Sequence, residues 1–247
     1  MNLYHRLIVG LFLVTPAFAQ NGTVKRSEEF EKPSPWAFIV PSALVSYGVI
    51  TQFSPALQDL SCRIDGKIAQ KVHRRYAFDN YIQYLPYAGI YIPDLCGAKA
   101  KHDVLDRTLV LGTSIMICSG AVLIPKYTAR ITRPDASNRH SFPSGHTATA
   151  FLGAHILFRE YRDVSPWIGI AGYGIAATTG MMRVVNRKHW LSDVFAGAGV
   201  GIISVELSCL MLPVWHRMFR SNAEGGYLTV SPLFSPNGFG VCLCCMF

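Results

Sequence analysis

Apolar and polar segments alternate along this chain on the scale of whole helices. Five segments are apolar over a length that crosses, or nearly crosses, a bilayer as a helix, which takes about 20 residues. They span residues 36–53, 109–125, 147–158 with its flanks, 167–182 and 194–215. A sixth, residues 81–95, is short and contains two prolines and an aspartate, so it either lies in the interface or re-enters the membrane. We therefore expect an all-α, membrane-embedded bundle of five or six helices.

A segment between the first two apolar stretches has a different pattern. Residues 58–80 place Leu60, Ile64, Ile68 and Val72 at intervals of four, with basic residues between them. This spacing predicts an amphipathic helix. The helix either lies on anionic lipid or packs on the bundle with a solvated outer face.

The two ends of the chain differ from its apolar middle. The first 19 residues have the pattern of a secretory signal peptide, with a short basic region, an apolar core and an Ala-Phe-Ala site before Gln20. An uncleaved membrane anchor is the alternative, although about 13 apolar residues are short for a span. Near the other end, a Pro-Asn-Gly turn between apolar residues predicts a short β-hairpin. The chain thus divides into a signal peptide, a polar lead-in, a membrane domain with its motif core at residues 126–193, and a tail: residues 1–19, 20–34, 36–216 and 217–247.

Composition supports a membrane protein with anionic partners. Half of the residues are apolar, 15% are charged and the mean hydropathy is +0.26, which is too apolar for an ordinary soluble domain. The net charge of +8 suits lipid head groups or phosphate esters, and basic cytoplasmic loops would produce the same surplus. The seven cysteines are odd in number and no C-x2-C pair recurs, so neither a disulfide framework nor a metal site is expected.

Three polar clusters interrupt the apolar segments of the membrane domain. Lys126 and Arg133 are seven residues apart, so on a helix they point the same way, and Pro134 would end that helix. Ser144 is a suitable N-cap for the next helix, and Gly145 lets a ligand approach the backbone. The free N–H groups and the dipole of that helix favour an anion there.

The second and third clusters supply two histidines. His146 opens the same helix, beside the predicted anion. His189 and Asp193 are four residues apart, so on a helix they share a face, and the carboxylate can fix one imidazole tautomer and leave the other ring nitrogen as a nucleophile. Arg183 adds a third cation. Together these groups predict a phosphate pocket that contains both an acid and a nucleophile.

The order and spacing of the clusters, K-x6-RP, then PSGH, then R-x5-H-x3-D, resemble the three signature motifs of the type-2 phosphatidic acid phosphatase superfamily. That superfamily also contains the vanadium-dependent haloperoxidases. The resemblance covers residues 81–213 and implies a core of six helices. One position departs from the pattern, because the third motif usually begins Ser-Arg and Met182 precedes Arg183 here. The departure removes one hydroxyl near the phosphate.

The resemblance implies phosphoryl transfer without a metal or a cofactor. His189 would attack phosphorus to form a phosphohistidine, oriented by Asp193, and His146 would protonate the leaving alkoxide. The remaining residues of the clusters would bind the phosphate oxygens: Lys126, Arg133, Ser144, Gly145 and Arg183.

A site at the ends of membrane helices can take a phosphate from a lipid whose chains stay in the bilayer. The class of substrates that the resemblance implies comprises lipid A, an undecaprenyl diphosphate, phosphatidylglycerol phosphate and phosphatidic acid. Two alternatives stay open: a vanadate-dependent haloperoxidase, which would hold vanadate through His189, and a non-catalytic membrane protein that binds anionic lipid. The expected partners are the bilayer and a phosphorylated lipid, with no nucleic acid.

The chain is expected in the inner membrane of a bacterial envelope. If the signal peptide is cleaved, residues 36–53 run inward and the cations at residues 63–75 lie on the cytoplasmic side. If residues 81–95 then do not span, the three clusters emerge on the periplasmic side. If those residues span and the signal peptide is cleaved, the site faces the cytoplasm. The charge pattern and the superfamily's habit of working at the outer face of the inner membrane favour the periplasm.

Overall fold

The computed structural model describes residues 33–71, 77–95, 97–220, 227–235 and 238–246. The expected signal peptide and most of the polar lead-in lie outside the described residues.

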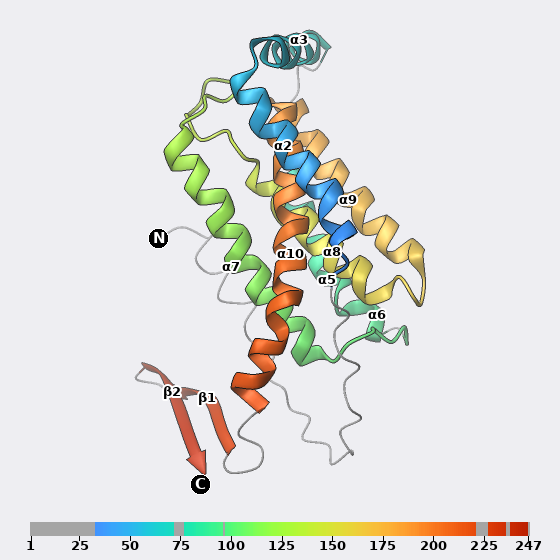
Figure 1. The fold of residues 1–247 in the computed structure, drawn as a ribbon, viewed down its shortest axis with the longest axis vertical. Coiled ribbons are helices and arrows are strands. Elements are labelled where there is room, and N and C mark those ends of the chain that lie inside the picture. The colour runs from blue at the N-terminus through green and yellow to red at the C-terminus, as the bar shows by residue number, and fades with distance from the viewer. Residues whose placement is uncertain (1–32, 72–76, 96, 221–226, 236–237, 247) are drawn as a thin grey trace.

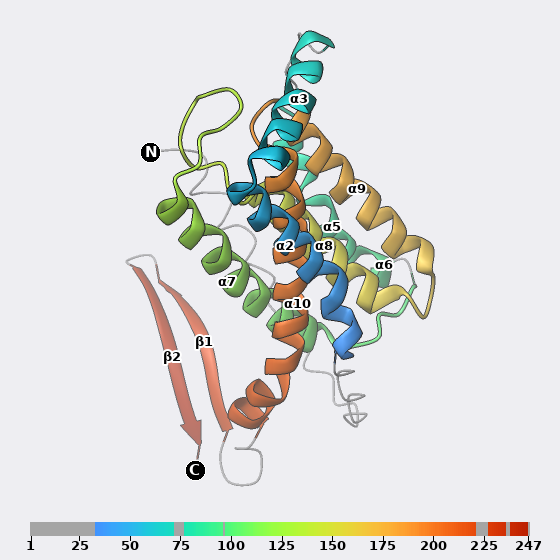
Figure 2. The same ribbon diagram turned by 45° about the horizontal axis from the view of Figure 1, so that its top comes forward.

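Five long helices form a bundle, with α10 running through its middle (Figures 1 and 2). They are α2 (Ile39–Phe53), α7 (Val104–Ala129), α8 (Gly145–Tyr161), α9 (Pro166–Val185) and α10 (Leu191–Arg220). Helix α10 packs against α2, α7 and α8, and α8 packs against α9. A short 3-10 helix, η1 (Pro35–Phe38), leads into α2. The helical bundle expected from the apolar segments is confirmed.

Four of these helices are long and apolar enough to cross a membrane: Pro35–Phe53, Val104–Ala129, Pro166–Val185 and Leu191–Arg217. The fifth, α8, has 17 residues, most of them buried. Its apolar segment is therefore a helix enclosed by its neighbours.

Two glycines of α10 let it approach α8 closely. A Cβ atom on Gly201 would lie 2.4 Å from the carbonyl oxygen of Ala148, and one on Gly197 would lie 2.5 Å from that of Ser144. Real Cβ atoms do not come so close to a carbonyl oxygen, so a larger residue would push the helices apart. The close packing expected from the small residues of this segment thus fixes the start of α10 beside the start of α8.

Residues 79–95 cross the whole bundle as three short helices, α4 (Asp79–Ile82), α5 (Leu85–Gly89) and α6 (Ile92–Leu95). At one end Asp79 is ion-paired with Arg183 in the last turn of α9, and at the other Asp94 is ion-paired with Arg107 in the first turn of α7. The expectation that this segment only re-enters the membrane or lies in the interface is therefore wrong. It supplies the sixth element of the bundle, broken into short helices at its prolines.

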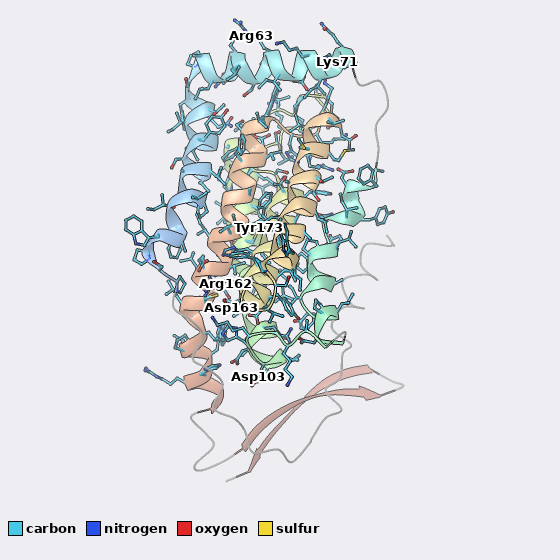
Figure 3. All side chains as sticks on the ribbon, turned by 90° about the vertical axis from the view of Figure 1, so that its right-hand side faces the viewer. Arg63, Lys71, Asp103, Arg162, Asp163 and Tyr173 are labelled. Atoms are coloured by element: carbon cyan, nitrogen blue, oxygen red, sulfur yellow. The ribbon has the colours of Figure 1, made fainter. Side chains whose placement is uncertain are left out.

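Helix α3 (Pro55–Lys71) lies across one end of the bundle (Figures 1 and 3). Its Asp65 is buried and forms an ion pair with Arg187, in the loop between α9 and α10. Arg63 and Lys71 point away from the bundle, and Asp103, Arg162 and Asp163 lie at the opposite end (Figure 3). The predicted amphipathic helix is confirmed up to Lys71, whereas residues 72–76 of the predicted range lie outside the described residues. The cations of α3 lie at the end of the bundle that also carries the three clusters, so the expectation that they lie on the opposite side is wrong.

Two antiparallel strands follow α10, β1 (Tyr227–Ser235) and β2 (Gly238–Met246). Ser235 pairs with Gly238 across the turn. The strands lie in the segment where the sequence predicts a hairpin.

Buried charges inside the bundle are paired. Glu206 of α10 accepts hydrogen bonds from His155 and Arg159 of α8, each at 2.6 Å, and His155 is also bonded to the hydroxyl of Tyr173 on α9. A carboxylate at such a position is costly unless it is paired, so this cluster ties three helices together.

Candidate active site

The three clusters meet at the end of the bundle that α3 covers. The last turn of α7 carries Lys126, the first turn of α8 carries His146, and the last turn of α9 carries Arg183. His189 lies two residues before the start of α10, and Asp193 lies in the first turn of that helix. Four helix ends therefore bring the groups predicted from the sequence to one place.

Arg133 reaches this place from a loop, not from the helix that carries Lys126. Helix α7 ends at Ala129 because Arg130 adopts a left-handed conformation with φ of 50°. The expectation of one continuous helix ended by Pro134 is therefore wrong. The Lys126 ammonium donates a hydrogen bond to the carbonyl oxygen of His140, 3.2 Å away, which ties α7 to the loop before the second cluster.

His189 is held as the tautomer that a nucleophile needs. It is buried, and its Nδ1 lies 2.7 Å from the carbonyl oxygen of Ser141. Because a carbonyl oxygen can only accept, Nδ1 carries the proton and Nε2 keeps a free lone pair. The sequence did not reveal Ser141, because a main-chain oxygen has no residue signature.

Asp193 acts on His189 less directly than expected. Its Oδ2 lies 3.7 Å from Nδ1, beyond hydrogen-bonding distance, which corrects the expectation that the carboxylate itself binds the imidazole. Oδ2 instead accepts from the hydroxyl of Ser141 and, at 2.9 Å, from the backbone N–H of Trp190. The carboxylate thus positions the residue whose carbonyl holds His189, and it caps the start of α10.

The start of α8 has the predicted N-cap. The hydroxyl oxygen of Ser144 accepts from the N–H of Thr147 at 3.5 Å, and the Ser144 N–H donates to the carbonyl oxygen of Asp193 at 3.0 Å. A Cβ atom on Gly145 would lie 3.5 Å from Cγ1 of Val122 and 4.0 Å from Cε of Lys126, so this glycine packs against the last turns of α7. The N-terminus of a 17-residue helix, with its positive dipole end, therefore lies beside Lys126.

Two residues of α4 that the sequence analysis did not single out complete the arrangement. Asp79 is buried and its Oδ2 accepts from Arg183 at 2.8 Å. The side-chain oxygen of Asn80 lies 2.9 Å from Nε2 of His146 and 3.5 Å from Nη1 of Arg183. More than 60 residues separate each of these pairs in the sequence, so no local spacing could have indicated them.

The site is electrostatically positive, and both imidazoles are neutral near pH 7. Burial, with the charges of Arg183 and Lys126, lowers the pKa of His146 to about 3 against the opposing effect of Asp79. Burial also lowers the pKa of His189, against the opposing effect of Asp193. A neutral His189 is ready to act as a nucleophile.

The guanidinium groups have unused donors. Within the described part of the chain, the Nε–H groups of Arg133 and Arg183 are buried and have no hydrogen-bond acceptor. Buried donors without acceptors are rare, and two of them beside two imidazoles indicate a site for an oxyanion. No three His, Cys, Asp or Glu side chains among the described residues come together as ligands for a metal ion.

The loops around the site are linked by ion pairs. Arg187 binds Asp65 of α3 at 2.8 Å and donates to the carbonyl oxygen of Pro134. Lys188 binds Asp135 at 2.7 Å. Burial alone would raise the pKa of Asp135, but hydrogen bonds from Lys188 and Ser137 hold it well below its usual value. These contacts hold the loop of Arg133 against the loop that carries His189.

Residues 107–217 match the model of the PAP2 superfamily, and the match includes all three clusters. Residues 107–217 form a PAP2-superfamily segment. The resemblance drawn from the order and spacing of the clusters is thereby confirmed. Asp79 and Asn80 lie outside the matched residues of the PAP2 model.

The chain is also similar to individual proteins, two of them with crystal structures. Over 132 residues the chain is 42% identical to lipid A 1-phosphatase of Porphyromonas gingivalis, a match that covers 52% of this chain and 29% of that protein. The chain thus spans less than a third of that relative's length. Two crystal structures are similar, LpxE of Aquifex aeolicus (24% identity, 61% of this chain and 93% of that chain, TM-score 0.42) and a transmembrane PAP2-type phosphatidylglycerolphosphate phosphatase of Bacillus subtilis (17%, 72% and 96%, TM-score 0.44).

Proposed function

We propose that this protein is a metal-independent lipid phosphate phosphatase, with residues 36–216 as its catalytic domain. Its reaction is hydrolysis of a phosphomonoester or diphosphate of a membrane lipid. The observation that carries the proposal is the convergence of two neutral imidazoles on the buried, unpaired N–H groups of Arg133 and Arg183. The match of residues 107–217 to the PAP2 superfamily supports it.

In the first step Nε2 of His189 attacks phosphorus while the bond from phosphorus to the ester oxygen breaks. The tautomer set by Ser141 leaves the lone pair of Nε2 available for this attack. His146, which takes up a proton when the phosphate dianion binds, gives that proton to the departing oxygen. The lipid leaves as an alcohol and His189 becomes a phosphohistidine.

In the second step a water molecule attacks phosphorus, and neutral His146 removes a proton from that water. The bond between phosphorus and Nε2 breaks and inorganic phosphate is released. Lys126, Arg133 and Arg183, with the N–H group of Gly145, bind the phosphate oxygens in both steps. This stabilisation is expected to supply most of the rate enhancement in a phosphoryl transfer. The N–H group of Ser144, which the sequence predicted as a phosphate ligand, already donates to the carbonyl oxygen of Asp193 and instead holds the start of α8 against α10.

The substrate follows from the position of the site. It lies at the end of four candidate membrane spans, beside exposed apolar side chains such as Tyr127 and Met181, so a lipid can present its phosphate while its chains stay in the bilayer. Lipid A, an undecaprenyl diphosphate, phosphatidylglycerol phosphate and phosphatidic acid belong to this class. Similarity to lipid A 1-phosphatase makes lipid A the first substrate to test.

The test is release of inorganic phosphate by the purified protein from a panel of these lipids. His189→Gln should lower turnover by about 1,000-fold or more, because the glutamine amide cannot form the covalent intermediate. The matched control is His216→Gln, at the opposite end of the bundle, where the new side chain can still bond to Asp106. Wild-type activity should survive EDTA and be blocked by vanadate. Equal turnover of His189→Gln and wild type would overturn the proposal.

We further propose that the site end faces the periplasm of a bacterial inner membrane, as the resemblance implies. This orientation requires the start of α2 to lie on the cytoplasmic side. The competing orientation follows from a cleaved signal peptide, which would begin the chain outside, so that α2 would carry the site end to the cytoplasmic face. Arg220 lies at the opposite end of α10. A green fluorescent protein fused after residue 220 should therefore fluoresce, whereas an active alkaline phosphatase fused there would place the site in the cytoplasm.

A further inference from the structure

Asn80 of α4 lies between the two side chains that the proposed reaction uses on this side of the pocket. Its Oδ1 is 2.9 Å from Nε2 of His146 and 3.5 Å from Nη1 of Arg183. The neighbouring Asp79 fixes Arg183 through an ion pair and accepts a bond from Asn186. Helix α4 therefore holds the end of α9 and the start of α8 at once.

These contacts determine the proton positions on His146. A guanidinium group can only donate hydrogen bonds, so the Asn80 atom that faces Arg183 is the oxygen and not the amide nitrogen. An amide oxygen can only accept, so Nε2 of His146 is the donor in the second contact. In the neutral imidazole the proton is therefore on Nε2, and Nδ1 carries the lone pair.

We propose that Asn80 is a positioning residue that makes Nδ1 of His146 the atom that exchanges protons with the substrate. This inference rests on the proposed phosphatase reaction. The imidazolium transfers its Nδ1 proton to the ester oxygen as the bond to phosphorus breaks. In the second step Nδ1 takes a proton from the attacking water. Throughout both steps the Nε2 proton stays in its hydrogen bond to Asn80.

The geometry also distinguishes Asn80 from an ordinary packing residue. The Asn80 oxygen accepts from the cationic form of His146 as well as from the neutral form, so it supports the imidazolium without a charge of its own. The oxygen is shared with Arg183, whose own position Asp79 fixes. Removal of the oxygen leaves the imidazole free to rotate and to donate elsewhere.

The test compares Asn80→Leu, Asn80→Asp and wild type on two substrates, lipid A 1-phosphate and p-nitrophenyl phosphate. The lipid leaves as an alkoxide that needs a proton, whereas p-nitrophenolate leaves without one. The ratio kcat/KM covers the steps up to departure of the leaving group, so the second step does not enter. We expect Asn80→Leu to lower kcat/KM by about 10-fold to 100-fold for the lipid and by less than about threefold for p-nitrophenyl phosphate.

Asn80→Asp retains an oxygen acceptor and should keep kcat/KM for the lipid within about fivefold of wild type. The matched control is Gln83→Leu, in the turn after Asn80, whose side-chain amide donates to the Asn80 backbone carbonyl. Gln83→Leu should leave the ratio of the kcat/KM values for the two substrates unchanged. Equal losses of Asn80→Leu on both substrates, no loss on either, or failure of Asn80→Asp to restore activity would overturn the inference. A wild type inactive on both substrates would overturn the proposed function with it.

Discussion

Binding of a dianion in the site should be accompanied by uptake of a proton by His146. Without an anion, burial and the charges of Arg183 and Lys126 hold the pKa of His146 at about 3, so the imidazole is neutral at pH 7. A general acid must be protonated when the substrate is bound. The negative charge of the bound substrate can raise the pKa of His146 again.

The size of the effect follows from Coulomb's law. A dianion about 5 Å from the imidazole, at an effective dielectric constant of about 20, stabilises the imidazolium by about 7 kcal/mol. At about 1.4 kcal/mol for each unit, the pKa of His146 rises by about 5 units. Its value then lies near pH 8, and binding at pH 7 takes up about 0.9 of a proton at this group.

Calorimetric titration of the detergent-solubilised protein measures this uptake. Tungstate is a suitable ligand, because it is a tetrahedral dianion that does not titrate near neutral pH. The observed enthalpy is measured in buffers of different ionisation enthalpy, and the slope gives the number of protons bound. We expect the slope for wild type to exceed that for His146→Gln by about one proton. His189→Gln serves as the comparison for the other imidazole of the site.

A slope that His146→Gln leaves unchanged would refute this reasoning. It would mean that the proton is taken up elsewhere and that His146 is not the acid of the first step. If His189→Gln alone abolished the uptake, the two imidazoles would exchange their proposed roles.

Three further perturbations have defined outcomes. Asp193→Asn should lower kcat by about 100-fold with a small effect on KM, measured by phosphate release, because it disturbs the residue whose carbonyl orients the nucleophile. Gly197→Ala should displace the carbonyl of Ser144 and lower activity in the same assay. Gly112→Ala should leave activity unchanged, because a Cβ atom there meets nothing within 4 Å. Equal activities of the two variants would contradict the packing argument. Glu206→Leu should reduce stability by about 3 kcal/mol, seen as a lower melting temperature in detergent, because it removes the buried carboxylate that binds both His155 and Arg159 of α8. An unchanged melting temperature would show that the cluster contributes little.

The stability of the empty protein should also depend on pH through His146. Its folded pKa lies below the unfolded value of about 6.5, so between pH 6.5 and about 3 the unfolded chain binds a proton that the folded chain does not. Stability is therefore lost as the pH falls through this window, by up to about 1.4 kcal/mol for each pH unit. Melting curves from pH 7 to 4 should show the loss, and His146→Gln should reduce the slope.

Much of this arrangement could be predicted because it depends on local patterns. Apolar length predicted the helices that carry the site, and the N-cap of α8 followed from Ser144 alone. The three clusters predicted the cations and imidazoles that the structure brings together. Each of these signals is contained within a few residues of sequence.

The errors have a common physical cause, since each concerns a contact between distant segments or a backbone conformation. The helix expected to carry both Lys126 and Arg133 ends early because Arg130 adopts a left-handed backbone conformation. An arginine in the sequence does not predict that conformation. Helix α3 was assigned to the wrong side because the broken segment after it crosses the bundle. Asp79 and Asn80 had no signature, since their partners lie on other helices.

The hydrogen bond from His189 to the carbonyl of Ser141 has a consequence for mutational scanning. Every amino acid supplies that oxygen, so no single replacement at position 141 can delete it. Ser141→Ala tests the hydroxyl and leaves the acceptor in place. A scan that finds this position tolerant would therefore miss the carbonyl oxygen that fixes the tautomer of His189. Only an amide-to-ester change or a shift of the loop could reveal the role of that oxygen.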